Sequence, residues 1–178
     1  MLTAEALQEP RAILFVEDEA TSRKWFARAF GDEFTIVTAD GVTQALSILN
    51  LREHEFAVLV TDYRMPERDG MKLLRTVQRE HRHLIRLLAT AYAEKDVAIA
   101  AVNHGKVLRI LEKPLDDTLT REALREALAL HRAQSFERAL NEGRVAALRE
   151  TLGFLAHELN TPLGAIRGFV GSVSDRYL

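Results

Sequence analysis

Ala57-Val58-Leu59-Val60-Thr61-Asp62 is a short apolar run that ends on a hydroxyl and a carboxylate. An unbroken run of this kind is typical of a strand buried on both faces, as in a parallel sheet covered by helices. We therefore expect a buried strand over residues 57–60. Four similar runs occur elsewhere in the chain and predict four more strands: residues 12–16, 34–37, 84–89 and 107–111.

Segments of helical length separate these runs, and their apolar residues recur about every 3.6 positions. They cover residues 21–30, 42–51, 71–80 and 95–103, and a last helix is expected to begin near Asp117. A strand followed by a helix, repeated five times, predicts an α/β fold with a doubly wound, five-stranded parallel sheet.

Composition excludes several classes of protein. The 178 residues suffice for one full domain with a helical extension, and the net charge of −2 comes from well-mixed charges. No basic field therefore suggests a nucleic-acid partner. The absence of cysteine excludes disulfides and thiol catalysis and fits a reducing compartment. Without a secretion signal or an apolar run of about 20 residues, we expect a cytoplasmic protein.

Polar side chains stand at four of the five predicted strand ends. Glu17 and Asp18 follow the first strand, Asp62 the third, Thr90 the fourth and Lys113 the fifth. Because the carboxyl ends of parallel strands meet at one edge of a sheet, we expect these groups to converge. A single acid in such a place can instead be a helix cap or a solvated loop residue, but the full set favours a shared site.

Three converging carboxylates repel one another unless a cation lies between them. Mg²⁺ is suited to the role because it prefers oxygen ligands. Asp62 could then attack a phosphoryl donor as a nucleophile. The metal, Lys113 and the Thr90 hydroxyl would share the charge on the transferring oxygens.

Residues 12–130 resemble the receiver domain of bacterial two-component response regulators. The resemblance implies a flavodoxin-like sheet of order 2-1-3-4-5. The matching motifs are Ile13-Leu14-Phe15-Val16-Glu17-Asp18-Glu19, Asp62 with Met65-Pro66 and Asp69-Gly70, Ala89-Thr90-Ala91, and Lys113-Pro114.

The resemblance also implies roles for the site residues. Asp62 would be the phosphoacceptor, and Mg²⁺ or Mn²⁺ would be held by Asp18, Asp62 and the backbone carbonyl of Arg64. Glu17 would act through metal-bound water, while Thr90 and Lys113 would sense the phosphate. The Lys113–Pro114 bond would be cis. The family often has an aromatic residue three positions before the lysine, where this chain has Ile110, so the signal is expected to take another route.

Beyond Asp117 the chain is expected to be helical, with a hinge at Gly143. Apolar residues then recur at alternating spacings of three and four, which is the seam of a coiled coil or helix bundle. A parallel homodimer through this seam is expected; the alternative is one amphipathic helix packed on its own domain. The seam residues are Val145, Leu148, Leu152, Leu155, Leu159, Pro162, Ile166, Phe169 and Val173.

His157 falls opposite this seam, where a neutral imidazole could attack phosphorus. Glu158 beside it could accept the proton. The string Phe154-Leu155-Ala156-His157-Glu158-Leu159-Asn160-Thr161-Pro162-Leu163 resembles the phosphoacceptor helix of sensor histidine kinases. This resemblance implies that His157 is phosphorylated, Glu158 is the general base and Thr161 positions water. In contrast, His81 and His83 are expected in a solvated loop and His131 on a helix surface.

We thus expect an N-terminal tail (1–11), a receiver domain (12–134), a helical linker (135–147) and a partial kinase dimerisation helix (148–178). No Gly-rich phosphate loop in strand context occurs, so the chain alone is not expected to hydrolyse ATP or phosphorylate His157. It is interpreted as a piece of a receiver-first histidine kinase, whose partners are a second copy and a kinase or phosphotransfer protein. The alternatives are a stand-alone regulator whose helical tail is only a dimerisation or interaction output, and an enzyme with a small-molecule substrate.

Overall fold

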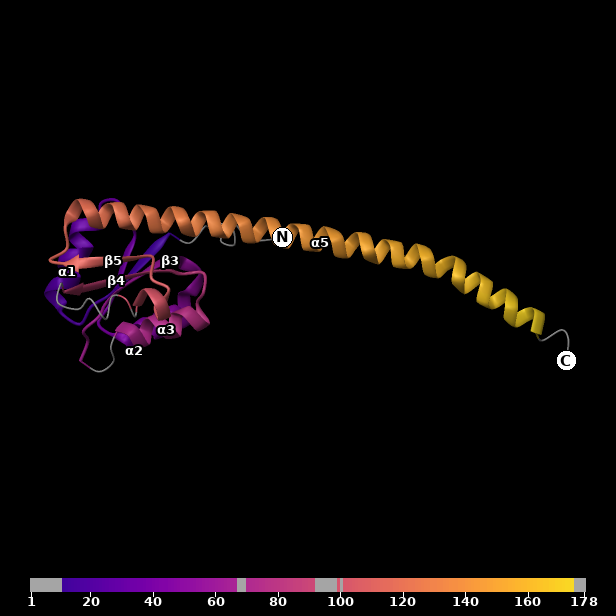
Figure 1. Ribbon diagram of the computed structural model, residues 1–178, viewed down its shortest axis with the longest axis horizontal. Helices are drawn as coiled ribbons and strands as arrows, with labels where there is room; N and C mark the ends of the chain where they lie inside the picture. Colours follow the sequence, from indigo (N-terminus) through magenta and orange to yellow (C-terminus); the bar gives the residue numbers. More distant parts are fainter. Residues whose placement is uncertain (1–10, 67–69, 92–98, 100, 175–178) are drawn as a thin grey trace. The chain divides into compact units, whose positions relative to one another are not determined.

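The computed structural model describes residues 11–66, 70–91, 99 and 101–174, and their side chains except at 101, 104 and 158–174. The chain divides after Ser135 into two compact units, and a five-stranded parallel sheet forms the centre of the first (Figure 1). The elements are β1 (Ala12–Val16), α1 (Ala20–Phe30), β2 (Ile36–Ala39), α2 (Val42–Arg52), η2 (Glu53–Glu55), β3 (Phe56–Asp62), α3 (Gly70–Glu80), β4 (Ile85–Ala91), η3 (Ala101–Gly105), β5 (Arg109–Lys113) and α5 (Asp117–Ser174).

The strand order is β2-β1-β3-β4-β5, and every neighbouring pair is parallel. This topology confirms the predicted doubly wound α/β fold. Every residue of β1 and β3 is buried, as expected for strands covered on both faces. The second strand is added on one side of β1 and the later strands on the other, so the carboxyl ends of β1 and β3 flank the topological switch point of the sheet.

Two apolar cores hold the helices against the sheet. Figure 1 shows α2 and α3 on one face and α1 with the first turns of α5 on the other. The first core joins Leu49 of α2 and Leu74 of α3 to buried strand residues. In the second, the rings of Phe15 and Phe26 stack with centroids 3.8 Å apart, and Leu124 of α5 belongs to the same cluster. Both faces are therefore covered, and the strand ends remain available for polar groups.

The predicted limits of four strands are wrong by one or two residues, and only those of β1 are confirmed. The third strand is Phe56–Asp62 rather than 57–60, and the fourth is Ile85–Ala91 rather than 84–89. The second strand is Ile36–Ala39 rather than 34–37, and the fifth is Arg109–Lys113 rather than 107–111. Phe34 and Val107 are buried ahead of these strands, so an apolar run marks burial there and not the start of the hydrogen-bonded ladder. At their other ends β3, β4 and β5 continue past the apolar run, so Asp62, Thr90 and Lys113 lie inside these strands instead of after them.

Two helix predictions also need correction. The helix predicted over 95–103 falls mostly outside the described residues, and its described end is a five-residue π-helix, Ala101–Gly105. The hinge predicted at Gly143 is not a break, because α5 is helical from Asp117 to Ser174. A glycine costs only about 1 kcal/mol in a helix interior, which the neighbouring turns of a long helix can offset.

The histidines predicted to be solvated are largely buried. His81 is 5% exposed and His131 is 2% exposed. His81 Nδ1 lies 3.0 Å from Glu53 Oε1, and His83 Nδ1 lies 3.4 Å from the same oxygen. Burial here depends on the packing of η2 and α5 against the α3–β4 loop, which local polarity does not reveal.

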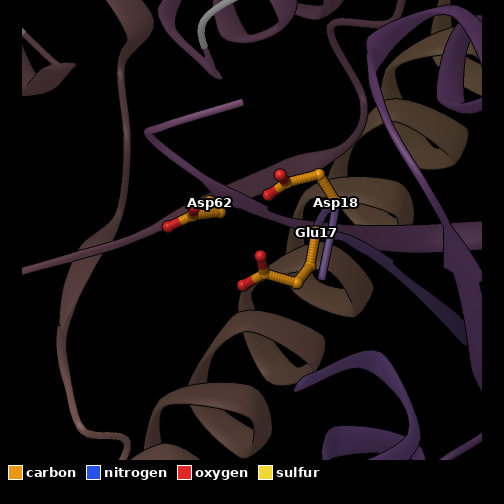
Figure 2. Close-up of side chains that lie close together, drawn as sticks. All are labelled: Glu17, Asp18 and Asp62. Carbon is orange, nitrogen blue, oxygen red and sulfur yellow. The ribbon is translucent and has the colours of Figure 1, made fainter. Parts of the chain in front are cut away.

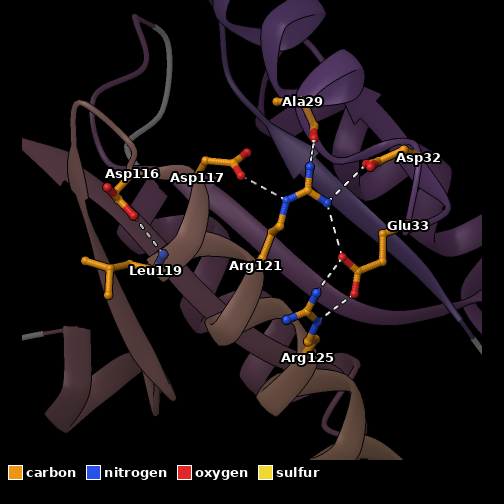
Figure 3. A network of polar contacts seen from close by, with 8 residues as sticks. All are labelled: Ala29, Asp32, Glu33, Asp116, Asp117, Leu119, Arg121 and Arg125. Carbon is orange, nitrogen blue, oxygen red and sulfur yellow. Dashed lines mark hydrogen bonds and ion pairs between the residues drawn. The ribbon is translucent and has the colours of Figure 1, made fainter.

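A network of arginines ties the first turns of α5 to the α1–β2 turn (Figure 3). Arg121 donates to Asp32 and Glu33, each at 3.1 Å, and to the backbone carbonyl of Ala29. Arg125 makes a bidentate contact with Glu33 at 2.6 and 2.9 Å. The hydrogen bond from Arg125 holds the pKa of Glu33 below its usual value. The start of α5 is thereby fixed to the receiver domain.

The second unit exposes apolar side chains along α5. Val145, Leu148, Leu152 and Leu155, which form the described half of the predicted seam, are between 46% and 63% exposed. The described part of the predicted seam is therefore open to solvent. Within the described residues, no helix has both the length and the apolar character required to span a lipid bilayer.

Candidate functional site

Three carboxylates gather at the carboxyl edge of the sheet (Figure 2). Glu17 and Asp18 directly follow β1, and Asp62 is the last residue of β3. One carboxylate oxygen of each residue lies within 4.8 Å of the other two. Glu17 is 2% exposed and Asp62 is 7% exposed, whereas Asp18 is open to solvent. The site therefore combines two buried carboxylates with one at its mouth.

Lys113 reaches this cluster from the end of β5. Its Nζ lies 2.6 Å from Glu17 Oε2 and 2.9 Å from Asp62 Oδ1. Burial raises the pKa of Glu17, and the repulsion from Asp62 adds to this effect, although the hydrogen bond from Lys113 opposes it. Burial alone would lower the pKa of Lys113, but the bonds to both carboxylates raise it overall. The ammonium thus stays charged and offsets part of the repulsion.

Backbone contacts place Asp62 at this position. The amide of Tyr63 donates to the carbonyl of Ala89 at 3.0 Å, and the amide of Gly70 donates to the carbonyl of Tyr63 at 2.9 Å. A Cβ added at Gly70 would lie 2.1 Å from the Asp62 carbonyl oxygen. Only glycine permits so close an approach of α3 to the end of β3.

The structure locates the remaining predicted receiver residues near the same edge. Thr90 is 5% exposed and lies in β4, one position beyond Ala89, which pairs with Asp62. Arg64 lines an open hollow together with Asp18 and Met65. The Lys113–Pro114 peptide bond is cis, as the resemblance implied.

The residues predicted on the C-terminal helix belong to the second unit. His157 is exposed on α5. Glu158 and Thr161 lie in the helical part of α5 whose side chains are outside the described residues. Their roles stay predictions.

Sequence reasoning missed Arg23, which lies in the first turn of α1. Its Nη1 donates to the backbone carbonyls of Glu17 and Asp18, at 2.6 and 2.7 Å. A basic residue one turn into a helix that follows an acidic pair was the available signal. It is a weak one, because bonds to backbone carbonyls need no particular partner side chain.

The donor set fits a hard divalent cation. Three carboxylate oxygens within 4.8 Å of one another match the preference of Mg²⁺ for oxygen ligands. Glu17 and Asp62 also repel each other in a buried setting, which a bound cation would relieve. Within the described residues no other group of three acidic or histidine side chains brings its ligand atoms this close.

Taken together, a doubly wound parallel sheet with three carboxylates and a lysine at one edge defines an α/β domain with an acidic site. The family model of the response regulator receiver domain matches residues 13–129. The chain therefore belongs to the response regulator receiver family, a class of two-component signal-transduction domains.

Known proteins similar to this chain agree with that membership. The hydrogenase transcriptional regulatory protein HoxA of Bradyrhizobium diazoefficiens is 28% identical over 123 residues, which cover 68% of this chain and 25% of HoxA. The DNA-binding transcriptional regulator NtrC of Salmonella typhimurium is 32% identical over 108 residues, 60% of this chain and 22% of NtrC. The chain thus spans about a quarter of the length of these relatives.

Solved structures show the same fold. The signal receiver domain of an HD domain-containing protein from Pseudomonas fluorescens superposes with a TM-score of 0.66 at 27% identity, covering 70% of this chain and 98% of that one. A response regulator receiver domain from Clostridium thermocellum has the same TM-score at 26% identity, with 70% and 98% coverage. The match to the family model ends at residue 129, within α5.

Proposed function

We propose that this receiver domain accepts a phosphoryl group on Asp62 and that α5 carries the resulting state to a partner. The observation behind the proposal is the position of Lys113 Nζ, which lies within 2.9 Å of both Glu17 and Asp62 at the sheet edge. It brings together a nucleophile, a counter-ion and acidic metal ligands from three different strand ends.

The chemistry follows from this arrangement. An Asp62 carboxylate oxygen forms the new O–P bond with a phosphohistidine or phosphoramidate donor. The donor's P–N bond breaks, and its nitrogen keeps the electron pair and takes up a proton. Lys113 is near enough to Asp62 to stabilise charge on the phosphoryl oxygens, and Thr90 supplies a hydroxyl for the same purpose.

Mg²⁺ or Mn²⁺ belongs to this proposal. Glu17, Asp18, Asp62 and the backbone carbonyl of Arg64 would hold the ion, with Glu17 acting through water. When bound, the ion would neutralise charge on the transferring group. Incubation with phosphoramidate and Mg²⁺ tests the proposal, which expects one phosphoryl group per chain and none without the metal.

The matched relatives favour a regulator whose helical tail is an interaction output. HoxA and NtrC are named as transcriptional regulators, and no kinase is among the relatives described above. The network of Arg121 and Arg125 supports a coupling between the receiver domain and α5, because it fixes the helix at its first turns. The cysteine-free composition fits a reducing compartment such as the cytoplasm.

The proposed partner of α5 is a second copy, docked in parallel through the Val145–Val173 seam. We expect Leu152→Glu to weaken dimerisation roughly a hundredfold, about 3 kcal/mol, because each chain would bury an unpaired carboxylate in the seam. Sedimentation or size-exclusion chromatography with light scattering measures the effect.

Leu140→Glu is the matched control for the seam. Leu140 is 46% exposed on the same helix but lies off the heptad positions. A wild-type chain that stays monomeric at high concentration would contradict the dimer, as would equal weakening by both substitutions.

A second candidate function is suggested by the string around His157, which is exposed on α5. In this hypothesis the helix is the phosphoacceptor helix of a histidine kinase. With a homologous ATP-binding domain supplied in trans, we expect acid-labile phosphate on the wild type and on His54→Gln, which alters another exposed histidine, but none on His157→Gln. Labelling that survives His157→Gln would eliminate this candidate and leave the regulator.

A further inference from the structure

We infer that Arg23 is a positioning residue for the proposed Mg²⁺ site, an inference that rests on the function proposed above. Its guanidinium Nη1 donates to the carbonyl of Glu17 at 2.6 Å and to the carbonyl of Asp18 at 2.7 Å. These are the two consecutive residues that carry acidic ligands from the end of β1. Arg23 therefore holds the backbone from which both carboxylates project.

The geometry of these two bonds ties Arg23 to a turned backbone. In an extended strand, successive carbonyl groups point in opposite directions. One nitrogen can reach two successive carbonyls only where the chain has left the strand conformation. The contact is thus compatible with the turn after β1 and not with a continuation of β1 through Glu17 and Asp18.

Arg23 is itself held by the start of α1. Its backbone amide donates to the carbonyl of Glu19 at 3.1 Å, which is the first helical bond of α1. Glu19 occupies the N-cap position and makes no side-chain capping bond there. The connection between β1 and α1 therefore depends on Arg23, whose side chain reaches back from the helix to the strand end.

The same turn also orients one carboxylate. The amide of Glu19 lies 3.3 Å from Glu17 Oε1, while Glu17 Oε2 is bound by Lys113 at 2.6 Å. Both oxygens of Glu17 are thus placed by groups on either side of the site. A shift of the turn would move the Glu19 amide and, with it, the direction in which Glu17 presents its oxygens.

The positive charge of Arg23 and its positioning of the backbone predict opposite effects on Mg²⁺ affinity when Arg23 is replaced. A positive charge near a cation site weakens cation binding, so electrostatics alone predicts that an uncharged residue tightens Mg²⁺ binding. Loss of positioning predicts weaker binding. Within the described part of the chain, Arg23 bonds backbone carbonyls and makes no ion pair with a carboxylate. Positioning is therefore expected to dominate, and the sign of the change separates the two effects.

Calorimetric titration with Mg²⁺ tests the inference. We expect Arg23→Gln to weaken Mg²⁺ binding about tenfold, the usual cost of losing a group that orients metal ligands. Because a single nitrogen makes both bonds, Arg23→Lys should bind within about threefold of the wild type. Arg28→Gln, which removes an exposed arginine from the last turn of α1, should leave the affinity unchanged.

Thermal melting with and without Mg²⁺ provides a second readout, in which Arg23→Gln should show a smaller metal-induced rise in Tm than Arg28→Gln. Equal or tighter Mg²⁺ binding by Arg23→Gln would overturn the inference. If the Arg23→Gln variant does not fold, Arg23→Met is measured in its place. Failure of both to fold would also overturn the inference, since Arg23 would then support the fold and not the site. If neither the wild type nor Arg28→Gln binds Mg²⁺, the proposed function itself fails.

Discussion

Asp62→Asn is expected to abolish phosphoryl incorporation, since an amide cannot replace the carboxylate that forms the acyl phosphate. The wild type should gain one phosphoryl group per chain from phosphoramidate and Mg²⁺, and hydroxylamine should remove it. The substitution is close to isosteric and relieves the repulsion between two buried carboxylates, Glu17 and Asp62. The variant should therefore fold, and intact-mass spectrometry can measure the loss directly.

Asp40→Asn is the matched control for this experiment. Asp40 is exposed at the end of β2, on the same edge of the sheet, and lies outside the group of three converging carboxylates. We expect it to accept phosphate as the wild type does. Incorporation into Asp62→Asn at the wild-type level would contradict the assignment of the nucleophile.

Gly70→Ala is expected to destabilise the receiver domain by at least about 2 kcal/mol, because the new methyl group cannot fit without moving backbone. Its Cβ would lie 2.1 Å from the carbonyl oxygen of Asp62 and 3.1 Å from Cα of Tyr63. Neither atom belongs to a flexible side chain. The same shift would displace Asp62, so phosphoryl acceptance should fall together with the free energy of unfolding in urea.

Gly41→Ala provides the contrast. Gly41 is the N-cap of α2 with an extended φ of 171°, and a Cβ there would meet nothing within 4 Å. We expect a change in unfolding free energy within about 0.5 kcal/mol. If the two alanine variants are equally stable, the close approach at Gly70 is not a constraint on the fold.

The sheet could be predicted because its strands are buried on both faces. Residues such as Leu59 and Val60 are apolar whichever way they point, so a short run identifies the strand without any alternation. The strand limits could not be predicted in the same way. Lys113 continues the ladder of β5 although it is polar, since backbone hydrogen bonding does not depend on side-chain polarity.

The convergence of Glu17, Asp18, Asp62 and Lys113 was predictable from topology, because parallel strands that each end on a polar residue bring those residues to one edge. The contacts that hold this edge in place were not. Gly70 and Arg23 act on backbone atoms, and such contacts leave no pattern of paired side-chain types in the sequence.

Burial of histidines was the clearest failure of local reasoning. The segment His81-Arg82-His83 is polar and follows a helix, which is typical of a solvated loop. Its surroundings include Glu53 from η2 and His131 from α5, whose ring lies 6.3 Å from that of His83. Packing between segments about 30 to 50 residues apart determines the environment of these rings, and the local sequence pattern does not predict it.

The central claim is that the ends of β1, β3 and β5 form one cation-dependent phosphoryl site around Asp62. Amide NMR spectra recorded with beryllofluoride and Mg²⁺ test it most directly, because beryllofluoride mimics the phosphoryl group on an aspartate. The account predicts large shifts at Asp18, Thr90 and Lys113 in the wild type and none in Asp62→Asn. Spectra that do not change, or that change equally in the variant, would contradict it.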